Sequence, residues 1–108
     1  MRFFLTAAFA ALVALPGVAQ AGFADGAIKI GVLTDLSGPY EGNGGHGSVT
    51  GAQIAADEFG NKVDGVPVKI LSADHQNKPD IGAAIAGRWF DAEHVNAISC
   101  LVNSFVAG

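Results

Sequence analysis

The chain has 108 residues, half of them hydrophobic, with ten acidic and six basic residues and a formal net charge of −4. This length allows one domain or less, and the apolar content with so small a net charge excludes a disordered chain. The six basic residues are scattered along the sequence, whereas nucleic-acid binding requires clustered positive charge, so no nucleic-acid partner is expected.

The first 21 residues have the pattern of a secretory signal peptide. Arg2 supplies a positive start, and an apolar run from Phe3 to Leu15 follows it. Residues 19–21 read Ala-Gln-Ala, which is an A-x-A cleavage site. The apolar run is shorter than the roughly 20 residues of a membrane span. We therefore predict export, cleavage after Ala21, and no stable membrane insertion of the mature chain, residues 22–108.

Strand and helix patterns alternate in the first half of the mature chain. Residues 27–33 are rich in β-branched side chains and are bounded by turn residues on both sides, which predicts a strand. Ser48 is a candidate N-cap, and apolar residues then recur at helical spacing as far as Phe59. Because Gly60 follows, as it does after many helices, we predict a helix over residues 48–59.

The second half repeats the alternation. Residues 66–71 form a second apolar, β-branched run and predict a second strand. A helical pattern covers residues 77–92, with Asn77 as its candidate N-cap. Residues 95–101 predict a third strand, after which residues 103–104 could open a further helix.

This order of elements predicts an α/β fold with two βαβ units and a parallel sheet. Sheets of this kind bind ligands beyond the carboxyl ends of their strands. The loops expected at that edge are residues 34–47, 73–78 and 102–105.

A glycine pattern, Gly42-x-Gly44-x-x-Gly47, lies between the first strand and the first helix. It matches the dinucleotide-binding fingerprint, with Asp74 as a candidate ribose-binding acid, and would indicate an exported α/β enzyme. The fingerprint requires its first glycine to turn the chain directly off the strand, but Gly42 comes eight residues after Thr34. We therefore favour the competing interpretation, a flexible loop.

The remaining polar groups do not predict a catalytic or metal site. The three histidines are His46, His75 and His94. They lack the spacing of zinc ligands, and we predict that they are exposed. Ser72, Asp74 and His75 are the residue types of a hydrolase triad, but they are packed into four positions, and adjacent positions seldom converge as a triad requires. Cys100 is the single cysteine, and we predict that it is a small buried apolar residue. We expect no enzyme activity, no metal and no cofactor.

Three segments resemble the opening of the periplasmic branched-chain amino acid (leucine) binding proteins: residues 28–40 (IKIGVLTDLSGPY), 51–60 (GAQIAADEFG) and 73–80 (ADHQNKPD). Their order and spacing, together with the signal peptide, carry the resemblance. It implies a periplasmic substrate-binding protein of an ABC importer for branched-chain amino acids or related small carboxylates. It also implies a type I fold, in which two α/β lobes close on the ligand at a hinge, and a membrane permease as partner.

By the same resemblance, four residues line the ligand cleft from the first lobe: Ser37, Tyr40, Asn103 and Ser104. Ser104 would open a helix, where its hydroxyl and unpaired backbone N–H groups favour a carboxylate. Tyr40 could pack on a ligand side chain. Residues 99–102 depart from the family pattern near this cleft, because cysteine is unusual there.

The resemblance extends over only the first half of the first lobe. It therefore implies that residues 22–108 form an incomplete first lobe, whose parallel sheet has strand order 2-1-3 with helices on both faces. The third strand would then have an unpaired edge. Two alternatives stay open: a fragment of an exported α/β enzyme that uses the 42–47 loop, and a truncated product without a function of its own.

Overall fold

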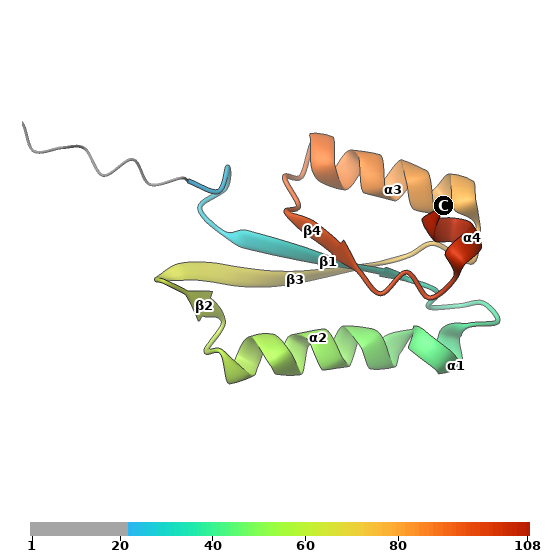
Figure 1. The fold of residues 1–108 in the computed structure, drawn as a ribbon, viewed down its shortest axis with the longest axis horizontal. Helices are drawn as coiled ribbons and strands as arrows, with labels where there is room; N and C mark the ends of the chain where they lie inside the picture. Colours follow the sequence, from blue (N-terminus) through green and yellow to red (C-terminus); the bar gives the residue numbers. More distant parts are fainter. Residues whose placement is uncertain (1–21) are drawn as a thin grey trace, which may run out of the picture.

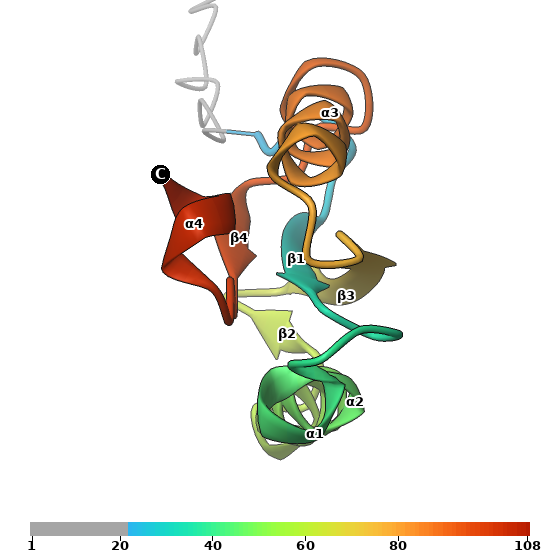
Figure 2. The ribbon, with the colours of Figure 1, turned by 90° about the vertical axis from the view of Figure 1, so that its right-hand side faces the viewer.

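The computed structural model describes residues 22–108, so the predicted signal peptide lies outside the described residues. In chain order the helices and strands are β1 (Ile28–Thr34), α1 (Glu41–Gly44), α2 (His46–Glu58), β2 (Lys62–Val63), β3 (Val66–Asp74), α3 (Pro79–Asp91), β4 (Ala97–Ser99) and α4 (Ser104–Ala107). The sheet forms the middle layer, with α1 and α2 on one face and α3 on the other, as Figures 1 and 2 show.

The sheet confirms the predicted α/β class. Its strand order is β2-β3-β1-β4, and both β3 and β4 pair parallel with the central strand β1. The three predicted strands therefore lie in the expected order 2-1-3. The sequence analysis missed β2, which pairs antiparallel with the start of β3. The connection is the dipeptide Asp64-Gly65, with φ values of 49° and 79°, and Asp-Gly with positive φ is the signature of a tight hairpin turn.

Both long helices begin elsewhere than predicted. α2 starts at His46, and its N-cap is Gly45, so Ser48 lies inside the first turn and caps nothing. α3 starts at Pro79 with Lys78 as N-cap, while Asn77 has a φ of 55°. A helix N-cap typically has an extended backbone, as Lys78 has with φ −121° and ψ 118°, so Asn77 in the left-handed region does not cap α3 and the predicted Asn77 cap is wrong.

β4 is shorter than the predicted strand over residues 95–101 at both ends, because it begins at Ala97 and ends at Ser99. Cys100, the next residue, has a φ of 66°, and this left-handed conformation cannot continue a strand. The structure also places Cys100 at the surface, so the prediction of a buried cysteine is wrong.

The core lies between the sheet and α3. Leu33 of β1, Trp89 of α3 and Val95 are buried and form one cluster. Gly31 makes this packing possible, because a Cβ atom built there would lie 2.2 Å from Cζ3 of the Trp89 ring. The central strand and α3 therefore approach each other as closely as they do only because residue 31 has no side chain.

Candidate functional site

The loops that follow β1, β3 and β4 gather at one end of the sheet, beyond the carboxyl ends of its parallel strands. Figure 1 shows α1, α4 and the start of α3 together at this end. We call it the carboxyl edge; it comprises residues 35–45, 74–78 and 100–104. It is the place where sheets of this class bind ligands.

The loop after β1 is held from inside by Asp35. This side chain is buried, and its carboxylate accepts hydrogen bonds from the backbone N–H groups of Gly38, at 2.8 Å, and Tyr40, at 2.9 Å. A Cβ atom at Gly38 would lie 2.6 Å from an Asp35 carboxylate oxygen, so the loop can wrap the carboxylate only with glycine there. The loop is therefore an ordered structure built around a buried carboxyl group.

Asp74, at the end of β3, holds the same loop from outside. Its Oδ1 accepts the backbone N–H groups of Leu36, at 3.0 Å, and Gln76, at 2.8 Å. Its Oδ2 accepts the hydroxyl of Ser37 at 2.6 Å. Partial burial opposes ionisation of this carboxyl, but the hydrogen bonds from Ser37, Leu36 and Gln76 favour the anion and hold its pKa below the ordinary value.

The turn after β3 is anchored by His75. The prediction that His75 is exposed is wrong, because its side chain is completely buried. Its backbone N–H donates to the Thr34 carbonyl at 2.9 Å, and its Nδ1 accepts the Asn77 N–H at 3.0 Å. Its Nε2 has no hydrogen-bond partner among the described residues. The other two histidines, His46 and His94, are exposed as predicted.

The loop after β4 ends at α4, and Asn103 is the N-cap of that helix. Its Oδ1 accepts the Phe105 N–H at 2.9 Å, and its backbone carbonyl accepts the N–H groups of Val106 and Ala107. Its Nδ2 donates to Oδ1 of Asn77 in the neighbouring turn. Ser104 is therefore the first residue of the helix, with an exposed side chain, and the amide groups that follow it are already bonded.

The structure brings the predicted ligand-binding residues to one edge. Ser37 and Tyr40 lie on the loop after β1, and Asn103 and Ser104 lie at the start of α4. No hydrogen bond joins the two pairs directly among the described residues; they are connected through the turn of residues 74–77.

The residues that hold the loops were missed by the sequence analysis. Asp35 lies directly after a buried strand, which is a signal for a carboxylate at the edge of the sheet. Asp74 falls inside one of the segments that carry the family resemblance, where it was considered only as a ribose or triad acid. Their roles depend on contacts with backbone N–H groups, which no residue pattern displays.

The glycine pattern forms neither a nucleotide loop nor a flexible loop. Gly42 and Gly44 lie in α1, and Gly47 lies in α2. Gly44 also packs closely on Val102, since a Cβ atom there would lie 2.8 Å from its Cγ2. Both interpretations of this segment are wrong, because its glycines make a helical connection with close packing.

Residues 22–108 contain neither a cluster of metal-ligating side chains nor a helix that could span a membrane. Within this range no three His, Cys, Asp or Glu side chains come together as a metal site. None of the helices of the same range is both long and apolar enough to cross a membrane.

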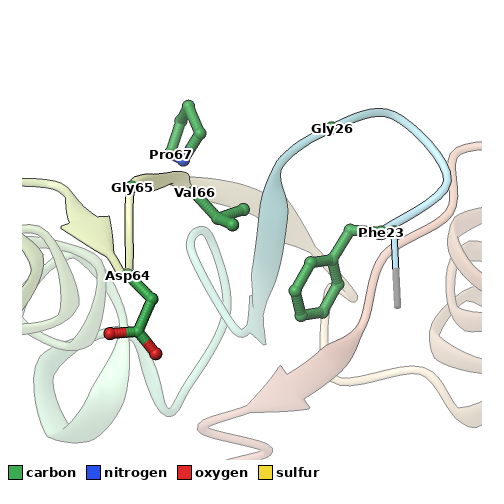
Figure 3. Close-up of a pocket in the computed structure, with 7 residues that line it drawn as sticks. Phe23, Gly26, Asp64, Gly65, Val66 and Pro67 are labelled. Atoms are coloured by element: carbon green, nitrogen blue, oxygen red, sulfur yellow. The ribbon is translucent and has the colours of Figure 1, made fainter. Parts of the chain in front are cut away.

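One hollow in the described part of the chain lies away from the carboxyl edge. It has a volume of about 490 Å³ and is lined by residues that precede β1, such as Phe23, and by the hairpin turn and first residues of β3, such as Asp64 and Val66 (Figure 3). These residues mark the amino ends of the strands. Neither the predicted site residues nor the carboxylates that hold the loops border this hollow, so it does not define the candidate site.

A sheet whose strands β3 and β4 both pair parallel with β1, with helices on both faces, defines the chain as an α/β fold, and comparison with known families identifies it. Residues 27–108 match the model of the periplasmic binding protein family. The chain belongs to this family. No curated protein matches it.

Solved structures agree with the family. A branched-chain amino acid ABC transporter periplasmic ligand-binding protein from Burkholderia xenovorans shares 46% identity with a TM-score of 0.71, over 74% of this chain and 21% of that one. A periplasmic binding protein from Burkholderia mallei shares 39% identity with a TM-score of 0.67, over 68% and 20%. A leucine binding protein from Thermotoga maritima shares 31% identity with a TM-score of 0.59, over 66% and 20%. The matched region spans about a fifth of the length of each of these proteins.

Proposed function

We propose that this chain belongs to the solute receptor of an ABC importer and binds branched-chain amino acids or related small carboxylates. The observation that carries the proposal is the ordered carboxyl edge, where buried Asp35 and partly buried Asp74 fix the loop that bears Ser37 and Tyr40. A preformed loop lowers the entropic cost of binding. The 46% identity to a branched-chain amino acid binding protein supports the solute class.

Within this proposal, Ser37, Tyr40, Asn103 and Ser104 form the ligand-facing residues of this lobe. Tyr40 is 36% exposed on an ordered loop and is available to pack on an apolar ligand side chain. Ser104 offers its hydroxyl to a ligand carboxylate. The amides of the following residues are bonded to Asn103, so the hydroxyl is the group that this end of α4 supplies.

The same geometry favours binding over catalysis. Asp74 is bonded to Ser37 and to backbone N–H groups, and Nδ1 of His75 is bonded to the Asn77 N–H, so these side chains do not form a triad with Ser72. The segment proposed for an enzyme, residues 42–47, lies in α1 and α2 apart from Gly45 between them. We therefore propose no catalytic residue and no cofactor.

The proposed place of action is the periplasm, and the proposed partner is the importer's membrane permease. The signal-peptide pattern of residues 1–21 supports export. The family relatives are periplasmic proteins of ABC transporters, which supports both the compartment and the partner.

The experiment is a graft, because the matched structures are about five times as long as the segment they share with this chain. Residues 27–108 replace the matched segment of the Burkholderia xenovorans protein, and the product is titrated with leucine, isoleucine, valine and benzoate in a calorimeter. Saturable binding of at least one of the amino acids is expected. The proposed function is contradicted if a folded graft binds none of the four solutes while the unmodified Burkholderia protein binds at least one of them.

A further inference from the structure

We infer that the turn of residues 74–77 is a positioning element that holds the loops on both sides of the proposed site in one arrangement. The inference rests on the proposed function for the location of the site, but the contacts that carry it belong to the chain without any ligand. The turn lies between the loop that bears Ser37 and Tyr40 and the start of α4, which bears Ser104.

The turn contacts the first loop through one carboxylate. Asp74 accepts the Leu36 N–H on Oδ1 and the Ser37 hydroxyl on Oδ2. These bonds join residues that lie 38 and 37 positions apart in the chain. Hydrogen bonds to a charged acceptor are the stronger kind, worth about 1.5–3 kcal/mol each. The lowered pKa of Asp74 agrees with a carboxylate that these donors stabilise as the anion.

The same carboxylate fixes the shape of the turn. Oδ1 of Asp74 also accepts the Gln76 N–H at 2.8 Å. Gln76 and Asn77 both have left-handed backbones, with φ values of 53° and 55°, a conformation that residues with a side chain seldom adopt in succession. Buried His75 secures it further by accepting the Asn77 N–H on Nδ1.

The turn contacts the second loop through Asn77. Its Oδ1 accepts a hydrogen bond from Nδ2 of Asn103, and the Oδ1 of Asn103 caps α4 by accepting the Phe105 N–H. The orientation of the Asn77 side chain depends on the left-handed backbone that Asp74 and His75 maintain. Hydrogen bonds thus link Leu36 to Asp74 at one end of the turn, and Asn77 through Asn103 to Phe105 at the other. The backbone of the turn, shaped by the bonds of Asp74 to Gln76 and of His75 to Asn77, joins the two sets.

This arrangement predicts an asymmetric response to substitution. Asp74→Ala removes the acceptor for the first loop and also loosens the turn, so both loops lose order. Asn77→Ala removes only the link to Asn103, so the second loop alone loses order. Asp74→Asn retains an oxygen for the Leu36 and Gln76 N–H groups but has no charge. The loops of this variant are therefore expected to be less ordered than in the unsubstituted chain and more ordered than in Asp74→Ala.

The test is amide hydrogen exchange on the ligand-free chain, followed by NMR at the Leu36 and Phe105 amides. Asp57→Ala is the matched control, because Asp57 is also a carboxylate with two side-chain hydrogen bonds, but it lies on α2. Protection at Leu36 is expected to fall about tenfold or more in Asp74→Ala. Protection at Phe105 is expected to fall in Asp74→Ala and Asn77→Ala, and both amides are expected to be unchanged in the control.

Acid titration separates a positioning role from general destabilisation. The pKa of Asp74 is lowered in the folded chain, so the stabilisation that its carboxylate gives the loop is complete above about pH 4, close to the ordinary pKa of an aspartate. This stabilisation declines as the pH falls through the lowered pKa. Leu36 protection, corrected for intrinsic exchange, is expected to fall with acid in the unsubstituted chain toward the level of Asp74→Asn. In Asp74→Asn it is expected to stay flat.

Three results overturn the inference: unchanged protection at Leu36 in Asp74→Ala, unchanged protection at Phe105 in the same variant, or an equal loss in Asp57→Ala. A graft that binds no solute, alongside the predicted exchange pattern, contradicts the proposed function and leaves the positioning role supported. The two claims therefore fail through different measurements.

Discussion

Replacing Gly31 with alanine would force the central strand and α3 apart. The new Cβ atom would lie 2.2, 2.5 and 3.0 Å from three carbons of the Trp89 ring, where ordinary contacts begin at 3.4 Å. The ring is rigid and Trp89 is 3% exposed, so it cannot swing aside into solvent. Overpacking of this kind costs about 1–3 kcal/mol, and we expect about 3 kcal/mol because the overlap exceeds 1 Å.

Urea unfolding followed by circular dichroism measures this change. Gly87→Ala is the control, because Gly87 is exposed in α3 with no atom near its Cβ position; it is expected to stabilise by about 0.5–1 kcal/mol. Trp89→Leu removes the opposing ring, so the double variant with Gly31→Ala should be less damaged than the sum of the single variants. A loss below about 0.5 kcal/mol in Gly31→Ala alone refutes the packing account.

Three further predictions concern other parts of the chain. Asp35→Ala leaves the Gly38 and Tyr40 N–H groups without their acceptor and should lower the free energy of unfolding by about 2–3 kcal/mol; a urea midpoint equal to that of the unsubstituted chain contradicts this. Cys100 is exposed, so a thiol reagent should label the folded chain about as fast as the unfolded one, and strong protection would show that it is buried. Export should remove residues 1–21, and N-terminal sequencing that still finds Met1 in the exported protein argues against the signal peptide.

The main architecture could be predicted because it follows from periodic apolar patterns. The β-branched runs that became β1 and β3 and the helical spacing that became α2 and α3 are each long enough to be read locally. Elements of four residues or fewer, such as β2 and α1, are too short to show a periodic pattern of apolar residues. The hairpin turn Asp64-Gly65 was the available signal for β2.

The site could be located but its construction could not be predicted. The carboxyl edge follows from the parallel sheet, and the family resemblance places Ser37, Tyr40, Asn103 and Ser104 there. The function of Asp74 depends on a backbone N–H group 38 positions away, and such a contact has no periodic pattern. The burial of His75 was missed for a similar reason, because its backbone N–H and its Nδ1 meet their partners, Thr34 and Asn77, only in the folded chain.

The central claim is that the carboxyl edge of this chain binds the solute, and one comparison tests it most directly. In the grafted receptor, calorimetry with the tightest-binding amino acid compares Ser104→Ala with Ser72→Ala, a serine of β3 that lies outside the proposed site. Losing a hydrogen bond to a charged ligand group costs about 1.5–3 kcal/mol. The account therefore predicts that Ser104→Ala lowers the affinity for the amino acid about tenfold or more. It predicts unchanged binding in Ser72→Ala. Equal affinities in the two variants would contradict the account.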